Sequence, residues 1–372
     1  MLYEQMDYLI DNARRLLGGC IIIADDGTPM YTPDGEGNYS ALWTRDFAYM
    51  VESAVDLMAD EHIEACIRYL LNGQRDDGCI PDRVCADRTA LYTAGDPSIL
   101  TAEPNIDNAQ FLVFAVDAFL ERMPLERRFS QFGQWEPHLE QGMDYIPRDP
   151  DGLVYNNPSK PHSPYGFTDT IGKTGVLLME SLLYWRACRQ LERRYREIGY
   201  NGKAEDFKGR AVAIEDGIDV LWDDKSGALF AASEDCRKID IWGNAYAVYI
   251  EFPLSDKHDH VIDFLCNNYA RYVWNGQVRH LLQGEYWDRL LIAPYKDRYQ
   301  NGAYWATASG WVMSAILKKD AELARRMLGD LVEYFKNRGT FECVTLHDEQ
   351  LPNYVVSAVN VLGAVRRIIN GR

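Results

Sequence analysis

Clusters of aromatic, amide and acidic residues recur along the chain, and they combine side chains that bind hydroxyl groups with side chains that transfer protons. A carboxylate accepts paired hydrogen bonds from vicinal hydroxyls, and a neighbouring guanidinium donates to others. An aromatic face stacks on the apolar C–H face of a sugar ring, and the chain holds 23 Tyr and 9 Trp. The clusters lie at 43–46, 74–82, 103–108, 165–169, 240–244, 284–287, 300–305 and 341–342.

Between most clusters, apolar residues recur at the i, i+3, i+4 spacing of helices, and this spacing predicts twelve helices. The predicted helices span 3–17, 45–59, 61–73, 107–122, 129–145, 171–195, 203–222, 241–251, 255–272, 303–317, 319–337 and 353–370. The fold class is therefore all-α. Because no Pro/Gly/Ser linker and no shift in composition divides the chain, we expect a single domain over residues 1–372.

The gaps between predicted helices alternate in length. Gaps after odd-numbered helices are long, whereas most gaps after even-numbered helices have only a handful of residues, as helix hairpins require. If consecutive helices run antiparallel, all the long gaps emerge at one end of the bundle. Since loops on a rigid scaffold commonly carry ligand and catalytic residues, we predict the active site at that end.

Composition excludes several classes of partner. A net charge of −17 argues against nucleic acid and anionic membranes, and no apolar run reaches the 18–20 residues that would cross a bilayer. The start of the chain lacks the pattern of a secretion signal, and the eight cysteines form no Cys-x-x-Cys pair. We therefore expect a cytoplasmic protein with free thiols. The histidines show no zinc-like spacing, so neither a metal nor another cofactor is expected.

Five motifs in order along the chain point to a known group of enzymes. They are Trp-Thr-Arg-Asp at 43–46, Gly-Cys-Ile-Pro at 78–81, Trp-Asp-Asp-Lys-Ser-Gly-Ala-Leu-Phe at 222–230, Tyr-Gln-Asn-Gly-Ala-Tyr-Trp at 299–305 and Phe-Glu at 341–342. The ordered set resembles the six-hairpin glycosidases, the superfamily of glucoamylase, trehalase and processing α-glucosidase. The resemblance implies an (α/α)6 toroid, in which six inner helices are ringed by six outer ones.

The resemblance also implies an inverting, exo-acting glycoside hydrolase of a small oligosaccharide or glycoside. Such an enzyme needs one carboxylic acid to protonate the leaving oxygen and one carboxylate to activate water. Asp169 stands where relatives place the acid, although an Asp ahead of a helix is also a good N-cap. Glu342 matches the late base of trehalase-like relatives, and Glu285, between Gly284 and Tyr286, is the rival base. The sequence leaves the choice between Glu342 and Glu285 open.

Further loop residues are candidates for binding the sugar by stacking or by hydrogen bonds to its hydroxyls. Each has an ordinary structural alternative, such as packing for Trp and Tyr or a salt bridge at a helix start for Arg and Asp. The candidates are Trp43, Arg45, Asp46, Asn108, Tyr165, Lys173, Trp242, Asn244, Trp287, Gln300, Asn301, Tyr304 and Trp305.

Other functions on a related toroid remain open. A sugar phosphorylase needs a basic pocket near the base, for which Arg279 and Arg289 are available. An unsaturated uronyl hydrolase needs cations for the uronate, for which Arg45 and Lys173 are available. A sugar epimerase and a non-catalytic sugar-binding protein are the remaining alternatives. No motif encodes the identity of the sugar, because hydroxyl selectivity depends on the fine placement of hydrogen bonds.

Overall fold

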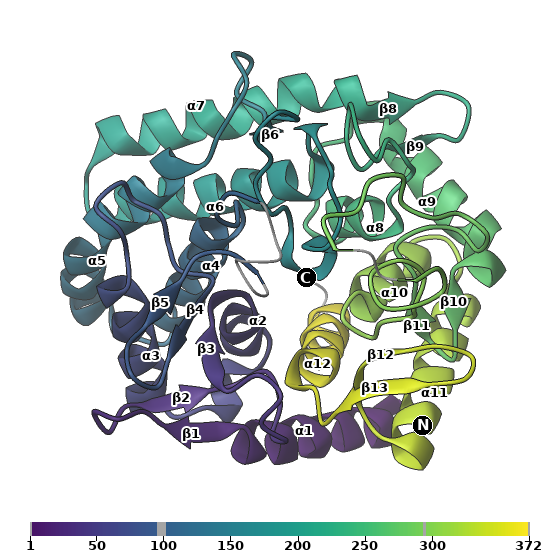
Figure 1. Cartoon of the computed structure of the whole chain (residues 1–372), viewed down its shortest axis with the longest axis horizontal. Coiled ribbons are helices and arrows are strands. Elements are labelled where there is room, and N and C mark those ends of the chain that lie inside the picture. The colour runs from purple at the N-terminus through teal and green to yellow at the C-terminus, as the bar shows by residue number, and fades with distance from the viewer. Residues whose placement is uncertain (1, 95–101, 293–294, 371–372) are drawn as a thin grey trace.

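The computed structural model describes residues 2–94, 102–292 and 295–370, and twelve α-helices lie within these ranges (Figure 1). Their bounds are α1 Leu2–Gly19, α2 Thr44–Ala54, α3 Asp60–Asn72, α4 Asn108–Leu120, α5 Leu125–Tyr145, α6 Leu178–Glu197, α7 Asn201–Gly217, α8 Ile241–Tyr249, α9 His258–Asn268, α10 Ser309–Leu317, α11 Ala321–Arg338 and α12 Val355–Ile369.

The even-numbered helices form a closed inner ring. Each packs against the next, from α2 through α10 to α12, and α12 packs back against α2. The odd-numbered helices lie outside this ring, with α1 against α12, α7 against α6 and α11 against α10 (Figure 1). This arrangement confirms the predicted toroid of six helical hairpins.

Burial explains which helices lie inside. In α4, 12 of 13 residues are buried, and in α8, 8 of 9 are buried. In the outer helix α7, only 4 of 17 residues are buried. A helix that is apolar on all sides must be enclosed, whereas one with a single apolar stripe covers a core and faces water. Within the described ranges, no helix combines the length and the apolar character needed to cross a membrane.

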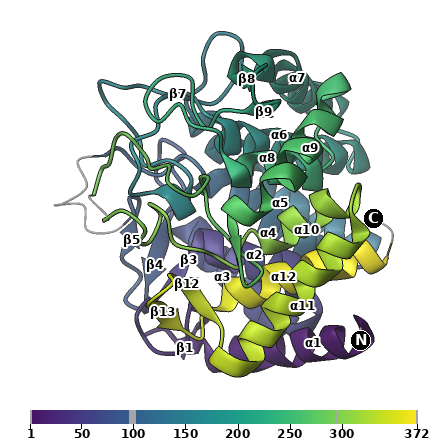
Figure 2. The same ribbon diagram turned by 90° about the vertical axis from the view of Figure 1, so that its right-hand side faces the viewer.

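Short antiparallel strands fill the long gaps. They are β1 Ile21–Ile23, β2 Pro29–Tyr31, β3 Ala41–Trp43, β4 Arg83–Cys85, β5 Ala90–Leu91, β6 Tyr155–Asn156, β7 Gly175–Val176, β8 Trp222–Asp223, β9 Ala228–Leu229, β10 Val273–Trp274, β11 Gln277–Val278, β12 Phe341–Val344 and β13 Glu349–Pro352. They pair as β1–β2, β3–β4–β5, β6–β7, β8–β9, β10–β11 and β12–β13. In Figure 2, β3, β4, β5, β12 and β13 lie on the side opposite the two chain termini. The long gaps that carry these strands therefore gather at one end of the ring, which we call the elaborated end.

The predicted helix at 171–195 begins seven residues late, at Leu178. The preceding residues form β7, which pairs with β6, and Gly175 has φ +80°, a left-handed conformation that a helix does not allow. The N-cap of α6 is Leu177, so the alternative role of Asp169 as an N-cap is wrong.

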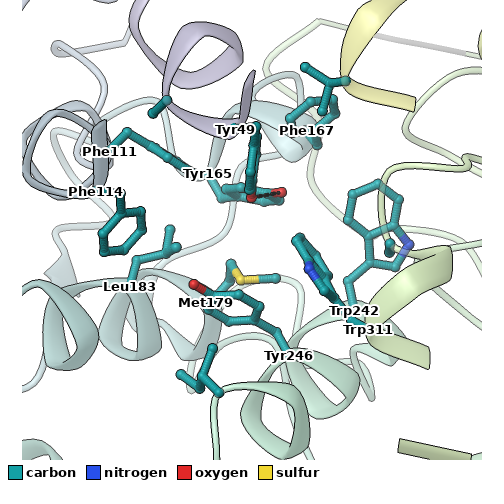
Figure 3. Close-up of a cluster of buried hydrophobic side chains, with 14 of the residues drawn as sticks. Tyr49, Phe111, Phe114, Tyr165, Phe167, Met179, Leu183, Trp242, Tyr246 and Trp311 are labelled. Carbon is teal, nitrogen blue, oxygen red and sulfur yellow. Dashed lines mark hydrogen bonds between the residues drawn. The ribbon is translucent and has the colours of Figure 1, made fainter. Parts of the chain in front are cut away.

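The centre of the ring is filled by aromatic side chains rather than by a channel. Figure 3 shows Tyr49, Phe111 and Tyr165 packed together, with Trp242 and Trp311 opposite them. The Tyr49 and Tyr165 hydroxyl groups are joined by a hydrogen bond of 2.9 Å. This cluster belongs to one continuous hydrophobic core, and it forms a floor beneath the elaborated end.

Inner helices α10 and α12 pack closely at Gly310, so a substitution there tests how tightly the ring is packed. A Cβ at Gly310 would lie 2.4 Å from the Cβ of Ala364, so the two inner helices would have to separate. We expect Gly310→Ala to lower the free energy of unfolding by about 1–3 kcal/mol, as overpacking of cores does. Gly209, in outer helix α7, has open space at the same position. Gly209→Ala is therefore the matched control and should stabilise the protein by about 0.5–1 kcal/mol in urea unfolding. Equal effects of the two changes would contradict the close packing.

Candidate active site

A cavity of about 370 Å³ opens at the elaborated end, above the aromatic floor. Three carboxyl groups, those of Asp46, Asp169 and Glu342, line it together with one guanidinium, that of Arg45. The remaining lining residues are Pro33, Tyr39, Trp43, Ala94, Gly166, Phe167, Thr170, Ile292, Tyr299 and Tyr354. The cavity thus joins acids and aromatic rings from loops that are distant in the sequence.

Arg45, in the first turn of α2, is held from several sides. Its Nη1 lies 2.9 Å from Asp82 Oδ1 and 3.4 Å from Asp107 Oδ1, and the side chain is only 4% exposed. Gly166 leaves the space that the guanidinium occupies, since a Cβ there would sit 1.6 Å from Nε. Asp107 Oδ2 in turn accepts a hydrogen bond from the Gly166 backbone N–H at 2.8 Å. Arg45 therefore ties the start of α2 to the loop that carries Asp169.

Asp169 follows a 3-10 turn at Gly166–Thr168, and its side chain is 14% exposed. Its Oδ1 accepts a hydrogen bond of 2.7 Å from the Gln300 amide, and its Oδ2 lies 3.9 Å from Arg45. Burial raises the pKa of Asp169 to about 7, although Arg45 and Gln300 oppose this shift. Thr170 fixes the amide of Gln300, because its N–H and hydroxyl both donate to Gln300 Oε1.

Glu342 lies on β12, and only one of its two carboxylate oxygens accepts hydrogen bonds from the protein. Oε1 accepts hydrogen bonds from the hydroxyls of Tyr39 at 2.8 Å and Tyr299 at 3.5 Å. Oε2 is buried without a protein partner. Burial raises the pKa of Glu342 to about 8, and the nearby Asp46 and Asp169 charges also raise it. Because buried polar atoms are normally paired, the unpartnered Oε2 calls for a partner such as a water molecule or a substrate hydroxyl.

Asp46 is the third carboxyl group of the cavity. Its Oδ1 accepts a hydrogen bond of 2.6 Å from the Tyr354 hydroxyl, and burial raises the pKa of Asp46 to about 6. Tyr354 is the N-cap residue of α12, and Trp43 is the N-cap residue of α2. The residues that directly precede these two inner helices therefore both line the cavity.

Of the residues singled out from the sequence, five line this cavity: Trp43, Arg45, Asp46, Asp169 and Glu342. Glu285 is half-buried and is not among the described residues that line it. Tyr39, Tyr299 and Tyr354 also line the cavity but were not among the site residues predicted from the sequence. The place of Tyr299 beside Gln300 was an available signal, whereas Tyr354 fell inside the predicted helix at 353–370.

Two other candidates, Trp287 and Trp305, contact the loop that carries Tyr299 and Gln300 without lining the cavity. Trp287 donates from Nε1 to the Gln300 carbonyl oxygen at 2.9 Å, and its backbone N–H donates to Asn301 Oδ1 at 3.0 Å. Trp305 donates from Nε1 to the Tyr299 carbonyl oxygen at 3.3 Å. These contacts fix the loop that presents Tyr299 and Gln300 to the cavity.

The remaining candidates are buried in the scaffold. Lys173 Nζ lies 2.9 Å from Glu180, and both side chains are almost wholly buried. The Asn244 amide donates to the carbonyl oxygens of Leu229 and Asp240. Asn108, Tyr165, Trp242 and Tyr304 are likewise buried and do not belong to the described lining of the cavity.

We compared the chain with known protein families, curated proteins and solved structures. No protein-family model matches the sequence, and no curated relative matches it. Among solved structures, the GH63 mannosylglycerate hydrolase from Thermus thermophilus in complex with glucose is similar, with a TM-score of 0.67 at 15% identity. The match covers 95% of this chain and 99% of that enzyme.

Two rhamnosidases are similar as well. The enzyme from Klebsiella oxytoca with rhamnose bound has a TM-score of 0.69 at 12% identity, over 99% of this chain and 64% of that one. The GH78 enzyme from Bacillus sp. GL1 has a TM-score of 0.63 at 13% identity, over 99% of this chain and 35% of that one. The chain therefore has the toroid fold of the six-hairpin glycosidases, and the resemblance inferred from its motifs is confirmed at the level of fold.

The raised pKa of Glu342 links the site to stability. Because the unfolded chain ionises Glu342 near its ordinary pKa of 4.5 and the folded chain only near pH 8, the folded state loses stability as the pH rises through this window. We expect Glu342→Gln to raise the melting temperature by several degrees above pH 8 and to change it little near pH 4.5. Glu285→Gln, outside the cavity, is the control for loss of one carboxylate. A Glu342→Gln effect that is the same at both pH values would contradict burial as the cause.

Proposed function

We propose that the protein is an inverting, exo-acting glycoside hydrolase that cleaves a small oligosaccharide or glycoside. The observation that carries the proposal is the meeting of Asp169 and Glu342 in one cavity, with the pKa of each raised into the neutral range. Burial raises the pKa of both groups and the Asp169 charge raises that of Glu342 further, so the pair retains a proton near neutral pH. One acid and one base in the same cavity are the requirement for glycoside hydrolysis.

In the proposed reaction, protonated Asp169 donates its proton to the glycosidic oxygen as the bond from that oxygen to the anomeric carbon breaks. Ionised Glu342 accepts a proton from a water molecule through Oε2, and the water oxygen bonds to the anomeric carbon from the opposite face. The products are the free alcohol and a sugar of inverted configuration.

The hydrogen bonds around the two carboxyl groups support these roles. Tyr39 and Tyr299 donate to Oε1 of Glu342 and so stabilise its charged form, while Oε2 stays available for water. Gln300 holds Asp169 in one orientation. Burial raises the pKa of Glu342 further than that of Asp169, which by itself would favour the reverse roles. Kinetics with activated substrates therefore decide the assignment.

The other lining residues support binding of a single sugar unit. Asp46 presents a second carboxylate to vicinal hydroxyls, and Trp43, Phe167 and Tyr354 present aromatic surface. The cavity of about 370 Å³, floored by the aromatic core, suits a terminal sugar with a small leaving group, which supports exo action. We also expect a reducing compartment such as the cytoplasm, because the eight cysteines are free thiols.

The alternatives find less support. Arg45 is the one cation in the described lining of the cavity, and its charge is already opposed by Asp82 and Asp107. Lys173 is paired with Glu180. Neither Arg45 nor Lys173 is therefore placed to hold a uronate. Arg289 is paired with Asp235 at 2.5 Å outside the cavity, which removes it as a phosphate ligand for phosphorolysis.

Turnover should depend on pH with a bell shape. Below about pH 7 both carboxyl groups are protonated and the base is lost, and above about pH 8 both are ionised and the acid is lost. We expect maximal kcat/KM between these values, measured on an aryl glycoside found by screening a panel. A profile that falls on only one side would show that a single group controls the reaction.

Substitution of each carboxyl group tests the roles. We expect Asp169→Asn and Glu342→Gln each to lower kcat by about 10²- to 10⁴-fold on a glycoside with a poor leaving group. On a 2,4-dinitrophenyl glycoside, whose leaving group needs no protonation, Asp169→Asn should recover most of its activity, whereas Glu342→Gln should not. The opposite pattern would reverse the two roles.

The same assays supply the control and the stereochemistry. Glu285→Gln should retain activity, because Glu285 lies outside the cavity. NMR of the first product formed should show the anomer opposite to that of the substrate. Retention of configuration would overturn the inverting mechanism, and unchanged turnover in Asp169→Asn or Glu342→Gln would remove that residue from the reaction.

A further inference from the structure

A second pocket, of about 340 Å³, lies on the other side of the loop that carries Tyr299. Asp297 and Arg298 line this pocket, whereas the next residue, Tyr299, lines the catalytic cavity. Arg279, which follows β11, also lines the second pocket. The two hollows have no lining residue in common within the described ranges, so the second one is a separate site.

Arg279 is buried, yet its guanidinium is only partly satisfied. The side chain is 3% exposed, and Nη1 lies 3.2 Å from Asp297 Oδ1. Nε and Nη2 are buried without a hydrogen-bond partner. Buried polar groups in folded proteins are nearly always paired, so a cation with two unpaired donor nitrogens calls for a missing partner.

The unpaired nitrogens form the edge of the guanidinium that binds oxyanions. Elsewhere in this molecule, Arg75 uses Nε and Nη2 together to hold the two carboxylate oxygens of Asp77. Two parallel N–H donors match the two oxygens of a carboxylate or a phosphate. Gly302 packs close to this edge, because a Cβ there would lie 2.8 Å from Arg279 Nη2.

The charge of the pocket also favours an anion. Arg279, Lys296 and Arg298 contribute three positive charges to its lining, against one negative charge from Asp297. The chain as a whole has a net charge of −17, so this excess of positive charge is local. Lys296 and Arg298 are exposed and can meet an incoming anion, whereas Arg279 is held inside.

The geometry points to a binding site for a small oxyanion, held in a bidentate manner by Nε and Nη2 of Arg279. The ligand is inorganic phosphate or the carboxylate of a small acid, since both offer paired oxygens of the required spacing. Because the pocket is separate from the cavity that holds Asp169 and Glu342, the anion is not a reactant there, and its binding does not depend on the proposed hydrolysis.

Calorimetric titration of the purified chain with inorganic phosphate, and separately with acetate and malonate, tests the site. We expect saturable binding of phosphate, of the carboxylates, or of both, and the preferred probe identifies the class of oxyanion. Arg279→Lys keeps the charge but removes the paired donors, so it should weaken binding at least about tenfold. Lys296→Gln/Arg298→Gln changes exposed residues only and should weaken binding several-fold in a folded protein.

Two controls make the result decisive. Arg14→Gln removes an exposed arginine of α1, far from the pocket in sequence, and should leave the affinity unchanged. Asp169→Asn should also bind the anion normally, which separates this site from the catalytic proposal. Absence of saturable binding to all three probes would overturn the inference. So would an affinity that neither Arg279→Lys nor the double variant reduces.

Discussion

The buried ion cluster around Arg45 is the interaction on which the elaborated end depends. Arg45 joins the first turn of α2 to Asp82, next to β4, and to Asp107, the N-cap residue of α4. Removing one partner of such a cluster leaves an uncompensated buried charge, which typically costs about 3–5 kcal/mol. The same guanidinium lies 3.9 Å from Asp169 and opposes the rise in its pKa. The Arg45 side chain therefore both joins α2 to its neighbours and lowers the pKa of Asp169.

The sequence predicted the helical framework closely because inner and outer helices carry different apolar patterns. Both patterns have a helical period, so all twelve helices were found, most with bounds within a few residues. The start of α6 was wrong because the segment after Asp169 pairs as β7, and a strand of two residues is too short to produce a period of its own. The other short strands were missed for the same reason.

The sequence located the acidic residues of the cavity better than its other residues. Asp46, Asp169 and Glu342 were found because they lie in segments that resemble the six-hairpin glycosidases, and Asp169 and Glu342 stand where those relatives place the acid and the base. Trp and Asn are used equally for packing and for ligand binding, so periodicity and residue type could not show that Trp242 and Asn244 are buried in the scaffold. Both residues lie in α8, and that distinction depends on how this inner helix is enclosed by its neighbours.

Closure of the ring by α12 against α2 has a consequence for how the protein forms during synthesis. The hydrogen bond from Tyr354 to Asp46 joins residues 308 positions apart. A nascent chain that ends before Tyr354 and α12 already contains Asp46 and Asp169, but its ring is open and Asp46 lacks its tyrosine partner. The cavity is therefore among the last features to appear, and early release of the chain yields helical hairpins without it.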